Sequence, residues 1–277
     1  ILSILVAFFN VAKVISLEFL GVTLRLVQTL GNVNLSLNHV VNTQVHIEKF
    51  KDLEKEIPFI REYYNVQDNL KDNAVKLENI SFKYFNSDVD IFTDLNLEIK
   101  KNKHTVITGP NGSGKSTLLG LIAGIFYPEN GKVLVSSNQL GYVGVTPLII
   151  EGTLKDNILY GNQKRVSDNE IVEVVNEFNL FNEKTELNLE MIISNRSLSS
   201  GQMQKISFIR SMLSDAKILL LDESTSNLDI NTKNFIFNIL SKKNITIINS
   251  THNQEDFDYD HHIKIDVGEN RKLFFVK

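Results

Sequence analysis

The sequence contains no cysteine. The chain therefore has neither disulfide bonds nor thiolate ligands for a metal, and it suits a reducing compartment. A basic surplus is also absent: 29 lysines and arginines stand against 33 aspartates and glutamates, and the formal net charge of −4 gives no electrostatic reason to expect nucleic acid as a partner. The apolar run at residues 1–9 lacks the preceding basic region and the cleavage site of a signal peptide, which argues against one.

The composition of the 277 residues fits one large or two modest globular domains. Hydrophobic residues make up 42% and charged residues 22%, so global disorder is not expected. The sequence begins with Ile1 rather than methionine, which predicts a fragment or a processed product. Along the chain the charge density changes sharply, from three charged residues in 1–47 to twelve in 48–72. This contrast indicates an apolar environment that gives way to water.

The first part of the chain has few residues that would break a helix. No proline lies between Ile15 and Ile57, and the only glycines there are Gly21 and Gly31. The spacing therefore predicts one long helix. Its polar residues form one stripe on a helix, because a polar side chain recurs every seven residues. Three of these polar residues are also followed, four positions later, by a residue with a hydroxyl group. The stripe consists of Glu18, Arg25, Asn32, His39 and His46, with Thr29, Ser36 and Thr43.

Two interpretations of this stripe stay open. It is either the solvated face of a soluble helix or the face of a membrane helix that lines a wet pathway, since charges inside a membrane normally face a cavity or a partner. Hydropathy alone does not establish a membrane span.

A glycine-rich loop carries the strongest chemical signal. The stretch GPNGSGKS follows the predicted strand HTVIT and precedes the predicted helix at residues 116–126, which is the context that supports a G-x-x-x-x-G-K-[ST] phosphate loop. Glycines let successive backbone N–H groups surround phosphate oxygens, the lysine adds a full positive charge, and the serine can ligate Mg²⁺. The loop residues predicted to bind a nucleotide are Gly109, Asn111, Gly112, Ser113, Gly114, Lys115, Ser116 and Thr117.

A second signal lies at the end of an apolar strand. Ile218–Leu221 are four consecutive apolar residues, and Asp222 and Glu223 follow them. The pattern predicts a buried parallel strand that ends at the nucleotide. There Asp222 can hold Mg²⁺ and Glu223 can polarise the attacking water.

Together these segments resemble the ATP-binding cassette (ABC) transporter family. The family's LSGGQ signature appears as LSSGQ at residues 198–202 and its D-loop as SNLD at residues 226–229. Its switch histidine matches His252 and its adenine-stacking aromatic residue matches Tyr84. The resemblance covers about residues 75–277, and the helix before them resembles the last membrane helix of exporters whose permease and ATPase share one chain.

The resemblance implies an α/β fold: a P-loop NTPase nucleotide-binding domain with an ABC helical subdomain, preceded by a long, mainly α-helical transmembrane segment. Residues 1–57 are expected to end the permease domain, 58–74 to form a linker, and 75–277 to form the nucleotide-binding domain. The implied activity is ATP hydrolysis that drives export or flipping of a substrate across a membrane.

The family also implies roles for single residues. Glu223, His252 and Lys115 would be catalytic, and Ser116 and Asp222 would bind Mg²⁺. Besides the phosphate loop, the residues implied to contact ATP are Tyr84, Ser199, Ser200, Gly201 and Gln202. The implied partners are a second ABC subunit, identical or different, and the cell membrane, with the nucleotide-binding domain in the cytoplasm. The last helix points to a lipid or lipid-linked sugar as the substrate, and no nucleic acid is expected.

Several positions depart from the family pattern. Val145 replaces the Q-loop glutamine, Ser200 replaces the first signature glycine, and the acidic motif before the signature is missing from MIISNRS. These changes affect coupling between the ATPase and the permease more than phosphate binding, so hydrolysis is still expected.

Two alternatives to an exporter are a soluble ABC ATPase of repair or translation and a regulatory nucleotide-binding subunit with weak hydrolysis. The acidic and histidine-rich segment EDFDYDHH at 255–262 is not expected to bind a metal.

Overall fold

A computed structural model describes residues 17–56, 64–67, 70–162, 164–181, 187–226, 228–252, 257–266 and 273–276. The chain divides into two compact units, Ile1–Phe59 and Ile60–Lys277, and each is described by itself.

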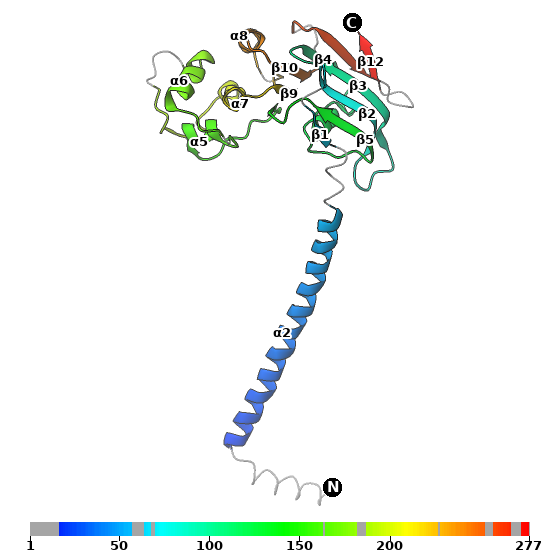
Figure 1. Ribbon diagram of the computed structural model, residues 1–277. Helices are drawn as coiled ribbons and strands as arrows, with labels where there is room; N and C mark the ends of the chain where they lie inside the picture. Colours follow the sequence, from blue (N-terminus) through cyan, green and yellow to red (C-terminus); the bar gives the residue numbers. More distant parts are fainter. Residues whose placement is uncertain are drawn as a thin grey trace, which may run out of the picture. The chain divides into compact units, whose positions relative to one another are not determined.

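The first unit contains the long helix that the sequence predicts. α2 (Leu17–Glu56) runs for 40 residues without interruption (Figure 1). The hydroxyls of Thr29, Ser36 and Thr43 each donate a hydrogen bond to the carbonyl four residues earlier, over 2.7, 2.9 and 2.7 Å. These bonds place the hydroxyls on one face with Arg25 and His39, as the stripe requires. The side chains of Glu18 and His46 lie outside the described ones.

Large apolar side chains of α2 are exposed on this chain, among them Val27, Leu30 and Val40. Within the part of the chain that the structure describes, no helix combines the length and the apolarity needed to cross a bilayer.

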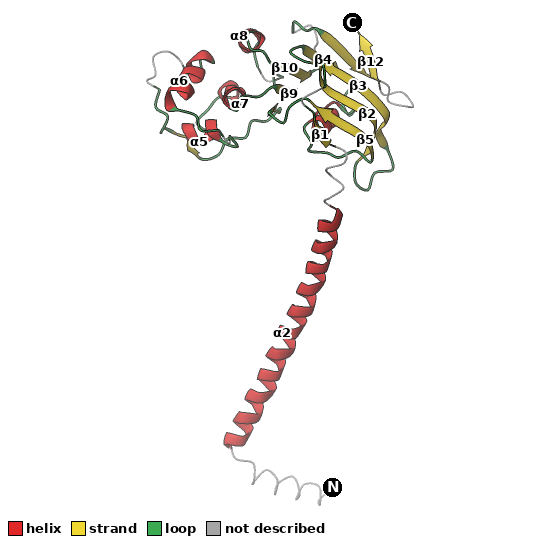
Figure 2. Cartoon of the chain, in the orientation of Figure 1, coloured by secondary structure: helices red, strands yellow, loops and turns green. Residues whose placement is uncertain are grey.

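The second unit contains two larger sheets and a two-stranded ribbon (Figure 2). In the four-stranded sheet the order is β1-β5-β2-β3, and β1 runs parallel to β5 while the other pairs are antiparallel. Its strands are β1 (Tyr64–Val66), β2 (Asn73–Lys83), β3 (Asp90–Lys100) and β5 (Asn130–Val135). β1 falls in the predicted linker at residues 58–74, and the sequence pattern does not predict it.

The six-stranded sheet has the order β12-β11-β4-β10-β9-β6. All neighbouring pairs are parallel except β11 and β12. Its strands are β4 (His104–Thr108), β6 (Leu140–Val143), β9 (Ile218–Asp222), β10 (Thr246–Ser250), β11 (His261–Ile265) and β12 (Leu273–Val276), and the short ribbon pairs β7 (Gly152–Thr153) with β8 (Ile192–Ile193).

The helices of this unit begin at residues suited to that position. Thr153, Ser167 and Ser199 each accept a hydrogen bond from the third residue of the helix that follows, and that residue's side chain bonds back, which forms a capping box. Figure 1 shows α5, α6 and α7 grouped together. The helices are α4 (Lys115–Ile122), α5 (Leu154–Leu159), α6 (Asp168–Glu177), α7 (Ser200–Leu213) and α8 (Ile230–Ser241).

β9 is buried on both faces, which explains its unbroken apolar run. Ile218 and Leu220 belong to the core that also holds the side chains of α4, whereas Leu219 and Leu221 belong to the core beneath α7 and α8. A parallel strand covered by helices on both faces requires apolar residues at every position. Beyond this run, β9 ends at Asp222, which lies opposite Ser250 of β10.

α4 is shorter than predicted, since it ends at Ile122 and not at residue 126. The chain turns back at Gly124, which has a φ of +70°. The ring of Phe126 then packs against Gly120, where an added Cβ would lie 2.4 Å from the ring. The apolar character of residues 123–126 therefore reflects packing onto the helix and not a further helical turn.

Candidate nucleotide-binding site

The phosphate loop connects β4 to α4, as predicted, and three of its glycines are required by the backbone. Gly112 and Gly114 have φ values of +73° and +103°, a region that residues with a side chain rarely adopt. At Gly109 an added Cβ would lie 2.7 Å from Ser113 Oγ and 2.8 Å from the Ile265 carbonyl oxygen. The loop conformation therefore depends on glycine at these positions.

The loop has unused capacity to bind an anion. No side chain caps the start of α4, because its N-cap residue is Gly114. The Ser113 hydroxyl is buried and has no hydrogen-bond partner among the described residues. Uncapped N–H groups at a helix N-terminus and a buried free hydroxyl form a donor set that suits phosphate oxygens. The residues present thus fit the phosphates of a nucleotide.

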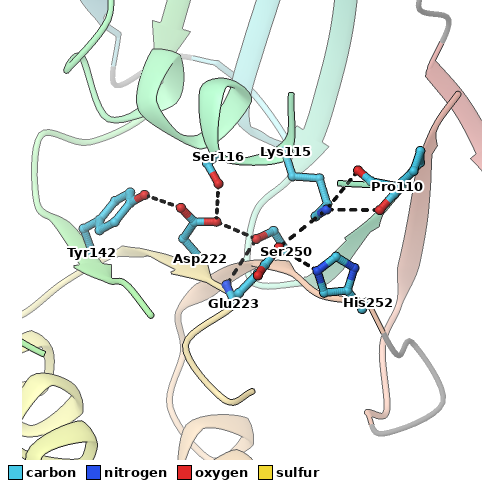
Figure 3. Close-up of polar contacts among 9 residues, drawn as sticks. Pro110, Lys115, Ser116, Tyr142, Asp222, Glu223, Ser250 and His252 are labelled. Carbon is cyan, nitrogen blue, oxygen red and sulfur yellow. Dashed lines mark hydrogen bonds and ion pairs between the residues drawn. The ribbon is translucent and has the colours of Figure 1, made fainter. Parts of the chain in front are cut away.

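Lys115 lies at the centre of the site and its side chain is only 4% exposed. Its Nζ donates hydrogen bonds to the carbonyls of Gly109 (3.0 Å) and Pro110 (3.3 Å). Nζ also lies 3.5 Å from Oε1 of Glu223 (Figure 3). The lysine therefore joins the glycine loop to the acidic end of β9, which the sequence places more than 100 residues away.

Asp222 accepts hydrogen bonds from three hydroxyl groups. Ser116 and Ser250 donate to Oδ1 over 2.9 and 2.8 Å, and Tyr142 donates to Oδ2 over 2.8 Å. The pair of Ser116 and Asp222 was predicted as a metal site, and the structure brings the two together. Oxygen donors of this kind suit Mg²⁺.

Glu223 has a left-handed backbone conformation, with a φ of +48°. Its N–H contacts the carbonyl and the hydroxyl of Ser250 over 3.1 and 3.2 Å, which holds this conformation in place. Its Oε1 lies 3.0 Å from Nε2 of His252. The structure therefore brings together the three predicted catalytic residues, Lys115, Glu223 and His252.

Tyr84 lies beside the loop and is half-exposed. Its hydroxyl is 2.7 Å from Oγ1 of Thr117, which places it against α4. Its ring makes edge contacts with Phe82 and Phe126, at centroid distances of 5.2 and 5.5 Å. Stacking of adenine on this ring stays a prediction.

The predicted signature residues do not join this cluster. Ser199 caps α7, and Gln202 pairs with it and donates to the carbonyl of Leu180 over 3.4 Å. Ser200 is exposed and Gly201 is half-exposed. Of the predicted D-loop, Asp229 caps α8 through the N–H of Thr232, while Asn227 lies outside the described residues. The contact of the signature with ATP stays a prediction.

Sequence reasoning missed two residues of the site, Tyr142 and Ser250. Both are polar residues near the end of a strand beside β9, but strand order is not visible in the sequence.

Val145, the residue at the Q-loop position, has an exposed fraction of 41%, and the carbonyl of the preceding Gly144 accepts a hydrogen bond from Gln204. Within the described ranges, no cluster of histidine and acidic side chains suits a metal, and residues 255 and 256 lie outside them.

The geometry of the site alone defines a class of protein. A glycine loop between a buried parallel strand and a helix, with a lysine and a strand-end aspartate beside it, is the site of a P-loop NTPase.

Residues 92–226 match the model of the ABC transporter family. The lactococcin-A transport/processing ATP-binding protein LcnC of Lactococcus lactis is 29% identical over 287 aligned residues, which cover 95% of this chain and 40% of that protein. The ATP-dependent permease MDL1 of Candida albicans is 34% identical over 64% of this chain and 29% of that protein. ABC transporter B family member 21 of Arabidopsis thaliana is 32% identical over 69% and 16%.

Residues 92–226 therefore carry the ATP-binding domain of ABC transporters, which is an ATPase domain. The chain spans 40% or less of the length of these three relatives.

Proposed function

We propose that residues 75–277 hydrolyse ATP to drive export or flipping of a substrate across a membrane. The observation that supports this most is that the phosphate loop and the start of α4 contact the acidic end of β9: Lys115 lies 3.5 Å from Glu223, and Ser116 donates to Asp222 over 2.9 Å. The relatives described as a transport ATP-binding protein and a permease favour this proposal over a soluble or regulatory ATPase.

The loop and Lys115 bind the phosphates. Lys115 is buried and reaches Glu223 from the loop, so its charge is little screened by water. Phosphate oxygens are better acceptors for an ammonium group than the two carbonyls that it contacts in this structure, because they carry charge. Lys115 therefore turns towards the terminal phosphate and stabilises the charge that develops there.

Ser116 and Asp222 are the residues that would hold Mg²⁺, because the serine hydroxyl and the carboxylate oxygen lie 2.9 Å apart and both are oxygen ligands. The ion would supply positive charge beside the phosphate oxygens.

Glu223 acts on water. Its carboxylate accepts the proton of the attacking water, and His252 lies 3.0 Å away and orients the carboxylate. The ion pair with Lys115 holds Glu223 at the phosphate end of the site. His252 would also contact the terminal phosphate.

A second cassette completes the site. Ser199 and Gln202 at the start of α7 hydrogen-bond to each other, and Ser200 faces solvent. An exposed helix N-terminus can bind phosphate from a neighbouring molecule. Two cassettes, identical or different, would then enclose ATP between one chain's loop and the other chain's residues 199–202.

The membrane part of the proposal rests on residues 1–57, with residues 58–74 as a linker and the ATPase domain in the cytoplasm. The exposed apolar side chains of α2, such as Leu30, suit contact with lipid or with other helices, and the stripe of Arg25 and His39 suits a wet pathway. The predicted lipid or lipid-linked sugar is one substrate to test, and the lactococcin named for the LcnC relative is another.

Phosphate release from ATP by the full chain tests the ATPase assignment. We expect steady-state hydrolysis that requires Mg²⁺ and stops in EDTA. ATP binding without any hydrolysis would support a regulatory subunit instead. Uptake of labelled lipid or lactococcin into vesicles that contain the whole protein tests export, and ATP-independent uptake would contradict it.

A further inference from the structure

Tyr142 reaches the acidic site from β6, which β10 and β9 separate in the sheet from β4, the strand before the phosphate loop. It lies in β6, where Tyr142 is paired with Leu220 of β9. Its side chain extends along the strand direction, and its hydroxyl donates to Oδ2 of Asp222 over 2.8 Å. Figure 3 shows Tyr142 approaching Asp222 from the side opposite Lys115. The Asp222 carboxylate is thus held by Tyr142 at Oδ2 and by Ser116 and Ser250 at Oδ1.

The hydrogen bonds of Asp222 can be counted. An ionised carboxylate accepts about four hydrogen bonds. Ser116 and Ser250 both donate to Oδ1, and Tyr142 donates to Oδ2. Oδ1 is therefore saturated, and Oδ2 has one lone pair left. Without the Tyr142 hydroxyl, both lone pairs of Oδ2 would be free of these donors and the carboxylate could rotate about its terminal bond.

The Tyr142 hydroxyl donates its hydrogen bond to a carboxylate oxygen of Asp222 over 2.8 Å. A carboxylate ion can only accept, so the direction of this hydrogen bond is fixed. A charged acceptor also makes it stronger than a neutral hydrogen bond.

We propose that Tyr142 is a positioning residue that orients the Asp222 carboxylate for the divalent cation bound with the nucleotide. This inference rests on the proposed function. The next three residues, Val143, Gly144 and Val145, carry no polar side chain, so among the described residues 140–145 only Tyr142 has a side chain that hydrogen-bonds to Asp222. Pre-orientation of a ligand lowers the cost of binding, because the carboxylate does not have to be ordered by the ion.

The test compares the full wild-type chain with Y142F and with Y160F. Tyr160 is also half-exposed and contacts Arg210 through its ring, which phenylalanine retains, so Y160F controls for the loss of a tyrosine hydroxyl. Binding of Mn²⁺ in the presence of ATP is measured by electron paramagnetic resonance. Loss of one hydrogen bond to a charged group should weaken Mn²⁺ binding about tenfold in Y142F and leave it unchanged in Y160F.

A second measurement separates positioning from general damage. The Mg²⁺ concentration for half-maximal ATP hydrolysis should rise about tenfold in Y142F, while the rate at saturating Mg²⁺ and the binding of ATP in EDTA stay close to wild type. Equal or tighter Mn²⁺ binding by Y142F would overturn the inference, as would a lower maximal rate with unchanged metal dependence. Failure of the wild-type chain to bind Mn²⁺ with ATP would instead overturn the proposed function.

Discussion

Replacing Glu223 with glutamine tests the proposed chemistry in one step. Glutamine keeps the size of the side chain but removes its charge and its basicity. In the structure the Glu223 Oε1 lies 3.0 Å from Nε2 of His252 and 3.5 Å from Nζ of Lys115, so both neighbours can still bond to an amide oxygen. The fold and the phosphate loop should therefore be unchanged.

The expected loss is catalytic. Removal of a general base costs about 10²–10⁴-fold in rate, and a hundredfold loss corresponds to about 2.7 kcal/mol of barrier. ATP should bind at least as tightly as before, because one negative charge beside the phosphates is gone. The assay is steady-state phosphate release, with E173Q on the exposed face of α6 as the matched control.

E223Q also tests whether two ATP-binding cassettes assemble. ATP that binds but is not cleaved should keep two cassettes closed, so Mg²⁺ and ATP should shift E223Q to a larger species on a sizing column. Hydrolysis at a near wild-type rate would remove Glu223 from its proposed role. An inactive variant that stays the same size at saturating ATP would count against self-pairing and point to a different partner cassette.

Three further predictions concern adenine binding and stability. Y84A should weaken binding of ATP and of GTP alike by about 1–3 kcal/mol in calorimetry, because stacking depends on the ring face, and a tenfold preference between the two would contradict it. G131A should destabilise by at least about 2 kcal/mol in urea unfolding, since its Cβ would meet the Glu78 carbonyl at 2.3 Å with φ at +92°. G161A, with φ at +77° and no neighbour within 4 Å, should cost only about 1 kcal/mol, and equal losses would refute the steric argument. Burial lowers the pKa of His104, so the folded state favours neutral histidine and stability should fall as pH drops below about 6.5. H104F should lose less stability between about pH 7.5 and 5.5 than wild type, and an identical loss would exclude His104 as the cause.

Local sequence patterns predicted the parts of the site that lie close together in the chain. The strand, glycine loop and helix around Lys115 form one continuous segment, and the strand that ends at Asp222 is buried on both faces. Both have periodicities and residue types that follow from local geometry.

The contributions of Tyr142 and Ser250 could not be predicted in this way. Each depends on which strand lies next to β9, and this order is set by packing between residues far apart in the chain. A tyrosine in a strand also resembles an ordinary residue of high β-propensity. Likewise, β1 is only three residues long and joins the sheet through β5, so the segment Tyr64–Val66 resembles a linker when it is considered alone.

The most direct test of the central claim, that this loop binds ATP, is calorimetry of ATP with wild type and K115A. A unit charge about 4 Å from a phosphate charge contributes about 4 kcal/mol at an effective dielectric constant of about 20, and about 1 kcal/mol is offset by contacts that Lys115 gives up. The remaining 3 kcal/mol or so corresponds to about a hundredfold weaker binding. We predict this loss in K115A and unchanged binding in K132A, a control on the exposed face of β5. An ATP affinity of K115A within about threefold of wild type would contradict the account.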